Sequence, residues 1–237
     1  MTTQQSRIIS KVLSPAVRLW LRSQLEQVED LNVKIEGRSG QIFTGYVPSV
    51  SVAARKAVYQ GLHLSQIQLG GENIRINLGG VLKGQPLRLL EPVPVSGSLL
   101  LEEADLKASL HSPLLSTALT ELFATLVPKH ILTNSGIDLK NCKITWEKVA
   151  IDSNSLTLGG TLATATGNQT PFVLSAGLQL ASSHQLRLAP LQIQLLPSLS
   201  QSNLEAFEVD LGEEVDIEEL TLISGQIVCR GSLRVIP

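Results

Sequence analysis

The sequence predicts an α+β fold in which a long, Leu-rich antiparallel sheet carries a few amphipathic helices. Three observations predict it. Apolar and polar residues alternate with a period of two over many short stretches, helical periodicity is confined to the N-terminus and the middle of the chain, and Gly or Ser pairs separate the stretches. The order helix, strands, helices, strands favours antiparallel pairing over a parallel βαβ fold. We expect a single elongated domain over residues 1–237.

Four consecutive segments make up this domain. They are an N-terminal amphipathic helix within 1–28, a first strand set at 29–101, central helices at 102–128 and a second strand set at 129–237. In the first set the irregular stretch 79–94 is expected to be an extended connection, and Ile42 to Val52 is expected to be a strand after a turn at Gly40.

The predicted helices are recognised from the signals at their starts and from apolar residues at helical spacing. Apolar residues recur at helical spacing over 6–28, where Ser14-Pro15 marks either a second helix start or a kink. Residues 102–110 suit a short helix. Ser112-Pro113 is an N-cap followed by proline at the first helical position, and the helix predicted from there ends before Pro128.

The composition limits the ligands and the partners. Hydrophobic residues make up 43% of the chain but aromatic residues only 3%, so the interior is aliphatic and suits alkyl chains better than flat rings. A net charge of −2 argues against nucleic acid as a partner, because general nucleic-acid binders carry a basic excess.

No motif in the sequence predicts catalysis or a metal site. The four histidines lie in unrelated segments, no Ser nucleophile elbow occurs, and the two cysteines are too far apart for a metal or redox motif. The acidic residues of 205–219 alternate with apolar ones, as in a strand with one solvated face. We therefore predict that the protein is not an enzyme and uses no cofactor beyond a bound phospholipid or fatty acid.

The N-terminal helix is the first candidate functional element. Its basic residues fall within a narrow arc beside an apolar face that contains one tryptophan, a pattern suited to an anionic membrane surface. The candidate membrane-surface residues are Arg7, Lys11, Arg18, Trp20 and Arg22. Four basic residues at about 1 kcal/mol each bind only at millimolar strength, so the apolar face must also insert or the contact is transient. The alternative is that this face packs on the sheet.

The central helices are the second candidate. Their apolar stripe either completes a filled core or borders an aliphatic groove between sheet and helix that holds acyl chains. The candidate groove residues are Leu106, Leu110, Leu114, Leu115, Leu119, Leu122, Phe123 and Leu126.

Several segments resemble a known family. They are 57–69, 73–77 and 101–106, together with 41–45 and 83–92. These residues resemble the LmeA-like phospholipid-binding family in its cyanobacterial branch, over most of residues 8 to 127. The resemblance implies a long antiparallel sheet curled around one or two helices, similar to tubular lipid-binding (TULIP-like) domains. It also implies phospholipid binding at or between membranes, and it carries no catalytic residues.

Together these features predict non-enzymatic lipid binding or transfer at a membrane surface. Lipid of an anionic surface is the expected partner, and a membrane-associated protein is a further one. The alternative function is a structural or assembly module that binds a protein partner and has a filled core. No stretch has the ~18 apolar residues of a transmembrane helix, and basic residues interrupt the N-terminal apolar run. The expected location is therefore cytoplasmic, peripheral on the inner or thylakoid membrane.

Overall fold

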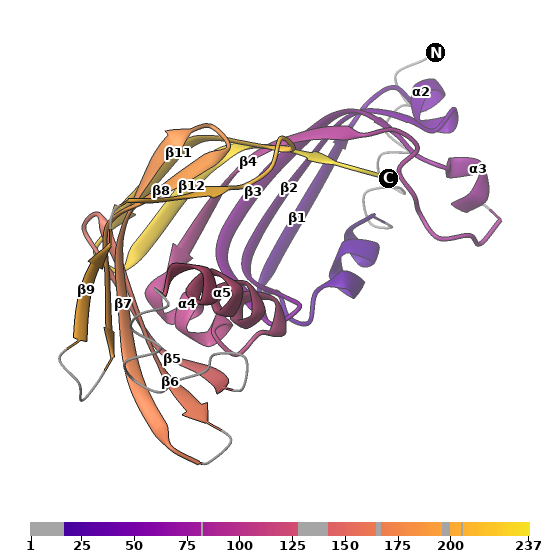
Figure 1. The fold of residues 1–237 in the computed structure, drawn as a ribbon. Helices are drawn as coiled ribbons and strands as arrows, with labels where there is room; N and C mark the ends of the chain where they lie inside the picture. The colour runs from indigo at the N-terminus through magenta and orange to yellow at the C-terminus, as the bar shows by residue number, and fades with distance from the viewer. Residues whose placement is uncertain (1–16, 82, 128–141, 165–166, 196–199, 205) are drawn as a thin grey trace.

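Two open antiparallel sheets make up most of the protein, as the computed structural model shows (Figure 1). The structure describes residues 17–81, 83–127, 142–164, 167–195, 200–204 and 206–237. The antiparallel, strand-rich class predicted from the sequence is confirmed. The expected single sheet is instead two sheets, and the wrapping of one long sheet around the helices is not confirmed.

The first sheet has six strands, and each neighbouring pair is antiparallel. In spatial order they are β1 (Asp30–Glu36), β2 (Tyr46–Tyr59), β3 (Leu62–Arg75), β4 (Val93–Glu102), β12 (Gln226–Val235) and β11 (Val215–Ile223). The turn between β2 and β3, Gln60-Gly61, has positive φ at both residues, 50° and 75°. Such a type I′ turn matches the twist of the strands that it joins.

The second sheet continues from the middle of the chain. In spatial order its strands are β10 (Phe207–Asp210), β8 (Gln185–Leu195), β7 (Gln169–Ser182), β6 (Ser155–Thr164) and β5 (Cys142–Asp152), and β9 (Ser200–Leu204) also pairs with β8. Because β11 and β12 follow this sheet in the chain but pair in the first one, the C-terminal residues complete the N-terminal sheet.

Backbone hydrogen bonds join the two sheets at the β5–β6 and β11–β12 turns. Gly225 N donates to Ile151 O (2.8 Å), and Asn154 N donates to Leu222 O (3.4 Å). Glu103 at the start of the central helices adds two more bonds, because its N donates to Gly225 O and its Oε2 accepts from Ile151 N.

The helices lie at the ends of the first sheet (Figure 1). They are a helix at residues 17–24, α2 (Ser39–Phe43), α3 (Leu78–Val81), α4 (Glu103–Ser109) and α5 (Pro113–Leu126). The predicted start of α5 is confirmed, since the Ser112 side chain accepts from Leu115 N at 3.0 Å and Pro113 occupies the first turn.

Two sequence expectations differ from the structure. The predicted strand from Ile42 to Val52 begins only at Tyr46, because the fully buried Ile42 lies in the short helix α2 and Gly45 (φ +80°) redirects the chain. The predicted helix over 6–28 ends at residue 24, because Gln27 pairs with Val58 as an isolated bridge. Residues 1–16, and with them Arg7, Lys11 and the Ser14-Pro15 step, lie outside the described residues.

Candidate functional site

One face of the first sheet is apolar across all six strands. The pairing register aligns three rows of directly opposed residues, and every member is aliphatic, glycine or cysteine. The rows are Leu31, Ala54, Ile67, Leu99, Cys229, Leu220; then Val33, Val52, Leu69, Gly97, Gly231, Ile217; then Ile35, Val50, Gly71, Val95, Leu233, Val215. We call this surface the apolar face.

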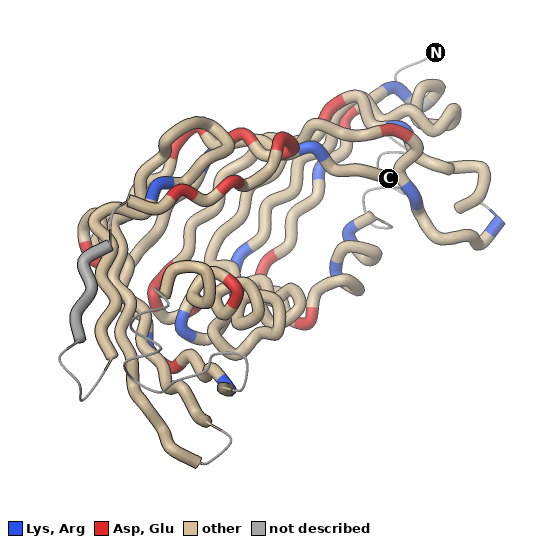
Figure 2. Tube along the Cα trace, viewed as in Figure 1, with Lys and Arg blue, Asp and Glu red and all other residues tan. Residues whose placement is uncertain are grey.

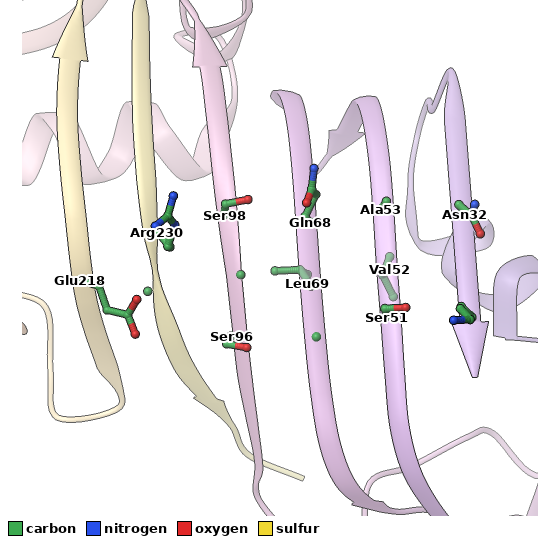
Figure 3. A pocket seen from close by; sticks show the side chains of 14 residues that line it. Asn32, Ser51, Val52, Ala53, Gln68, Leu69, Ser96, Ser98, Glu218 and Arg230 are labelled. Atoms are coloured by element: carbon green, nitrogen blue, oxygen red, sulfur yellow. The ribbon is translucent and has the colours of Figure 1, made fainter. Parts of the chain in front are cut away.

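The other face of the same sheet is polar. It includes the intervening row Asn32, Ala53, Gln68, Ser98, Arg230 and Glu219. A shallow hollow of about 690 Å³ on this face is lined mainly by serine, amide and charged side chains from several strands (Figure 3). Polar side chains of this kind interact favourably with water. The sheet is therefore amphipathic, with one face suited to solvent and one apolar face.

The helix at 17–24 covers only part of the apolar face. Its Val17 and Leu21 pack against the cluster that contains Val33 and Ile35 of β1, which are 5% and 6% exposed. Farther along the sheet, on β3 and β12, Leu69 is 37% exposed and Leu233 is 45% exposed. No described segment covers these two side chains, so the β3–β4–β12–β11 part of the apolar face is open.

A groove of about 280 Å³ lies in this open part. Its lining is almost wholly apolar and comes from β3, β4, β11 and β12. The lining includes Leu69, Val95, Gly97, Ile217, Gly231 and Leu233. We call it the glycine groove, because Gly97 and Gly231 lie directly opposite each other in the β4–β12 register.

The two glycines explain why the face is hollow at this point. A Cβ atom on Gly97 would lie 2.3 Å from the backbone O of Gln68, and one on Gly231 would lie 2.3 Å from the backbone O of Asp216. No side chain therefore fits there without moving a neighbouring strand. Between Leu69 and Ile217, the flanking members of the row, neither glycine contributes a side chain, and the Leu69 side chain lies close to Gly97, since its Cδ2 would be 2.7 Å from a Cβ atom there.

Cys229 contributes an uncharged thiol to the groove lining. Burial raises the pKa of this thiol above its usual value of 9.0, and the charge of Glu219 raises it further. The protonated thiol behaves as a small apolar group. Cys229 is a free, partly buried cysteine, and the groove has no charged side chain from β12.

A polar network fixes α4 against the other end of the sheet. Lys56 Nζ lies 2.6 Å from Glu102 Oε2 and 2.8 Å from Asp105 Oδ2, and the buried Ser65 hydroxyl donates to the same Asp105 oxygen. Burial raises the pKa of Asp105, but the hydrogen bonds from Lys56 and Ser65 outweigh it, so the pKa lies below its usual 3.8. The carboxylate therefore stays ionised and holds α4 in place.

The predicted groove residues of the central helices belong to a different core. Leu110, Phe123 and Leu126 are 2%, 0% and 5% exposed within the core cluster of the second sheet. Leu106, Leu115, Leu119 and Leu122 are partly buried against the same cluster, and Leu114 is 50% exposed. The structure thus brings seven of the eight together around the second sheet, and a lipid groove at these residues stays a prediction.

Three aromatic rings close that core. The Phe123 ring lies 4.4 Å from the Phe172 ring and 5.9 Å from the Trp146 ring, measured between centroids, and the second contact is edge-to-face. Trp146 Nε1 donates to Thr120 Oγ1 at 3.2 Å. The buried indole is therefore satisfied and α5 is held on β5 and β7.

The predicted membrane-surface residues that the structure describes are exposed. Arg18 and Arg22 lie at the surface of the 17–24 helix, and Trp20 is 41% exposed. The neighbouring Leu19, which is 70% exposed, was not among the predicted residues. Membrane contact at this helix stays a prediction.

The sequence analysis did not find the glycine groove. The signal was present, because Gly97 and Gly231 each interrupt an alternating apolar run. What the sequence alone could not show is that the two residues lie side by side, since this depends on a pairing between distant segments.

The described residues contain no group of three or more potential metal ligands. Among the helices of the same residues, none is long and apolar enough to cross a membrane.

Comparison with protein families gives one match, to the model described as LmeA-like phospholipid-binding, over residues 5–232. The chain belongs to this family. The match extends well beyond the part of the chain that carries the resemblance in sequence, and it includes the strands of both sheets. No curated protein and no solved structure matches the chain. The family is a phospholipid-binding family and not a known enzyme family, and it is consistent with peripheral association with membranes.

Proposed function

We propose that this protein binds phospholipid without catalysis, and that an acyl chain lies on the open part of the apolar face, in the glycine groove. The observation that carries the proposal is the uncovered position of Leu69 and Leu233 on a face that is apolar in all three rows. Membership of a phospholipid-binding family supports lipid as the ligand class.

The energetics favour an alkyl chain at this position. Burying one methylene contributes about 0.8 kcal/mol, so a segment of five or six methylenes contributes about 4 to 5 kcal/mol before the cost of ordering the chain. The groove volume of about 280 Å³ is at the lower end of the range for small-molecule sites. We infer that the groove holds a part of one chain and leaves the headgroup outside it.

The glycine groove is lined by strands of the first sheet alone, and not by the α5 stripe. The proposed site therefore differs from the predicted groove between sheet and helix in both its position and its residues. The alternative function, an assembly module with a filled core, is supported by the close packing of the α5 stripe. The open glycine groove speaks for lipid.

The helix at 17–24 supports a peripheral, membrane-associated mode of action. It uses Val17 and Leu21 for the sheet, while Leu19 and Trp20 remain exposed beside Arg18 and Arg22. An apolar and basic surface of this kind favours transient contact with an anionic bilayer, from which lipid is taken up or to which it is delivered.

The test is the lipid content of the purified full chain, extracted and measured by mass spectrometry. We expect bound phospholipid in the wild type. The double variant Leu69→Gln/Leu233→Gln is expected to bind phospholipid more than about tenfold more weakly, because each substitution places an amide in an apolar site. Ile223→Gln is the matched control, since Ile223 is 45% exposed like Leu233 but lies at the β11–β12 turn.

Wild-type protein that is consistently free of lipid and also takes up none from vesicles would overturn the proposal. A loss of lipid caused by Leu114→Gln, with the groove variant unaffected, would move the site to α5.

A further inference from the structure

The α2 and α3 helices lie together at one end of the first sheet (Figure 1). Backbone hydrogen bonds tie both connections to the end of β3: Ile76 N donates to Gly45 O (2.8 Å), and Leu90 N donates to Arg75 O (2.8 Å). The segment after α2 and the segment after α3 are therefore both joined to the same end of β3. We call this end of the sheet the α2–α3 tip and define it by Arg38, Phe43, Lys83, Arg88 and Leu90.

Two large apolar side chains of the tip face solvent. Phe43 is 66% exposed and Leu90 is 58% exposed, whereas the adjacent Ile42 is fully buried. The fold therefore uses Ile42 for its core and leaves Phe43 unused. In a chain with only four phenylalanines, an exposed Phe and an exposed Leu at the same end of the sheet are typical of a contact surface.

The tip is also basic. Arg38, Lys83 and Arg88 are exposed, and none of them forms an ion pair with a described residue. The acidic residues nearby are mostly neutralised, since Glu36 pairs with Lys34 and Glu91 pairs with Arg75, which leaves Glu72.

Acidic residues gather elsewhere on the molecule. Glu208, Asp210, Glu213, Asp216 and Glu218 are all exposed on and around β10 and β11 and form no ion pair with a described residue, whereas Glu214 pairs with Arg234 (Figure 2). An anionic planar surface therefore attracts the tip and repels these acidic residues.

We propose that the α2–α3 tip docks on an anionic phospholipid bilayer. The inference rests on the proposed function, because it names the membrane surface from which the groove receives its lipid. β4 begins at Val93, directly after the tip, and its next groove residue is Val95, opposite Leu233. Docking at the tip thus brings the bilayer to the end of β4 at which Val95 lies, and Gly97 is the next residue of the apolar face along this strand.

The experiment is co-sedimentation of the full chain with vesicles of phosphatidylcholine alone and of phosphatidylcholine with phosphatidylglycerol. Wild-type protein is expected to bind the anionic vesicles more tightly, and salt is expected to weaken this binding. Each basic residue near an anionic surface contributes about fivefold, so Lys83→Gln with Arg88→Gln lowers the partition coefficient about 30-fold. Phe43→Ser with Leu90→Ser is expected to lower it about tenfold or more.

Matched controls change the same residue types away from the tip. Lys107→Gln with Lys143→Gln removes two exposed charges, and Ile223→Ser with Leu114→Ser removes two exposed apolar side chains. Both control variants are expected to bind vesicles like the wild type. Tip variants that bind like the wild type, or controls that lose binding equally, would overturn the inference.

The lipid content of the same proteins separates this inference from the proposed function. Tip variants that retain bound lipid but lose vesicle binding support both. If the wild type contains lipid but binds to no vesicle, the docking proposal is overturned and the proposed function stands. The same holds if only Arg18→Gln with Arg22→Gln abolishes vesicle binding. Wild type that never contains lipid overturns the proposed function.

Discussion

Phe123→Ala is the substitution that best tests whether the central helix closes a packed core. The side chain is 0% exposed, and its ring contacts both Phe172 and Trp146. Truncation of a buried phenylalanine costs about 3 to 5 kcal/mol, and the two lost aromatic contacts place this site toward the upper end of that range. We expect a decrease of about 4 to 5 kcal/mol in the free energy of unfolding, a large fraction of the stability of a typical domain.

The assay is urea unfolding followed by far-UV circular dichroism, with Phe43→Ala as the control. Phe43 is 66% exposed, so the same truncation there is expected to change the free energy of unfolding by less than about 0.5 kcal/mol. A cost below about 1.5 kcal/mol for Phe123→Ala, with an unchanged denaturant slope, would refute the packed core.

Three further substitutions test other parts of the fold by the same unfolding assay. Asp105→Asn is expected to cost about 2 kcal/mol at pH 7, because the ion pair with Lys56 is lost. Since the pKa of Asp105 in the fold lies below its usual 3.8, this stabilisation is present above pH 3.8 and is lost as the pH falls through the lowered pKa, so the difference between the variant and the wild type should shrink as the pH falls below 3.8. Gly231→Ala is expected to lower the free energy of unfolding by more than about 2 kcal/mol, because its Cβ atom would clash with a neighbouring backbone. Gly40→Ala is expected to cost less, because a Cβ atom there has no neighbour within 4 Å. Equal effects of the two substitutions would contradict the strand geometry of the groove. Ser112→Ala is expected to cost about 1 kcal/mol through the lost cap of α5, and no change would contradict the capping contact.

Local structure was predictable where a single segment carries its own signal. The alternation in β7 and β12 identified strands and their two faces, and the Ser112-Pro113 pair identified the start of α5. Gly70-Gly71 is one of the Gly pairs expected to separate strands, but it lies inside β3, where both residues pair with β2. The short α2 helix was missed, because five residues containing two helix-compatible apolar side chains have no periodicity that differs from that of a strand.

The candidate site was not predictable, because it depends on register between distant segments. Leu69 lies opposite Gly97, and Gly97 lies opposite Gly231, so the groove joins residues from three regions of the chain. A one-residue change of register would place the polar row of β12 on this face instead. Nothing in an isolated alternating run specifies which run it pairs with.

The apolar stripe of α5 shows the same limit of prediction from a single segment. An apolar stripe predicts that a helix is covered, but not by what. In the structure the second sheet covers it, and three of the eight aromatic residues of the chain meet there. Its leucines therefore contribute to a core for the same reason that made them candidates for a groove.

The two sheets differ in how their apolar faces are covered, and this difference bears on function. Large rings and a 14-residue helix fill the space over the second sheet. The three rows of the apolar face contain no aromatic residue, and the described helix over them packs mainly at β1 and β2. A fold that lacks the side-chain volume to cover its own apolar surface is stabilised when an external chain covers it. The proposed lipid site therefore predicts that binding and stability are coupled: saturation with phospholipid should raise the unfolding midpoint of the wild type but not that of the Leu69→Gln/Leu233→Gln variant.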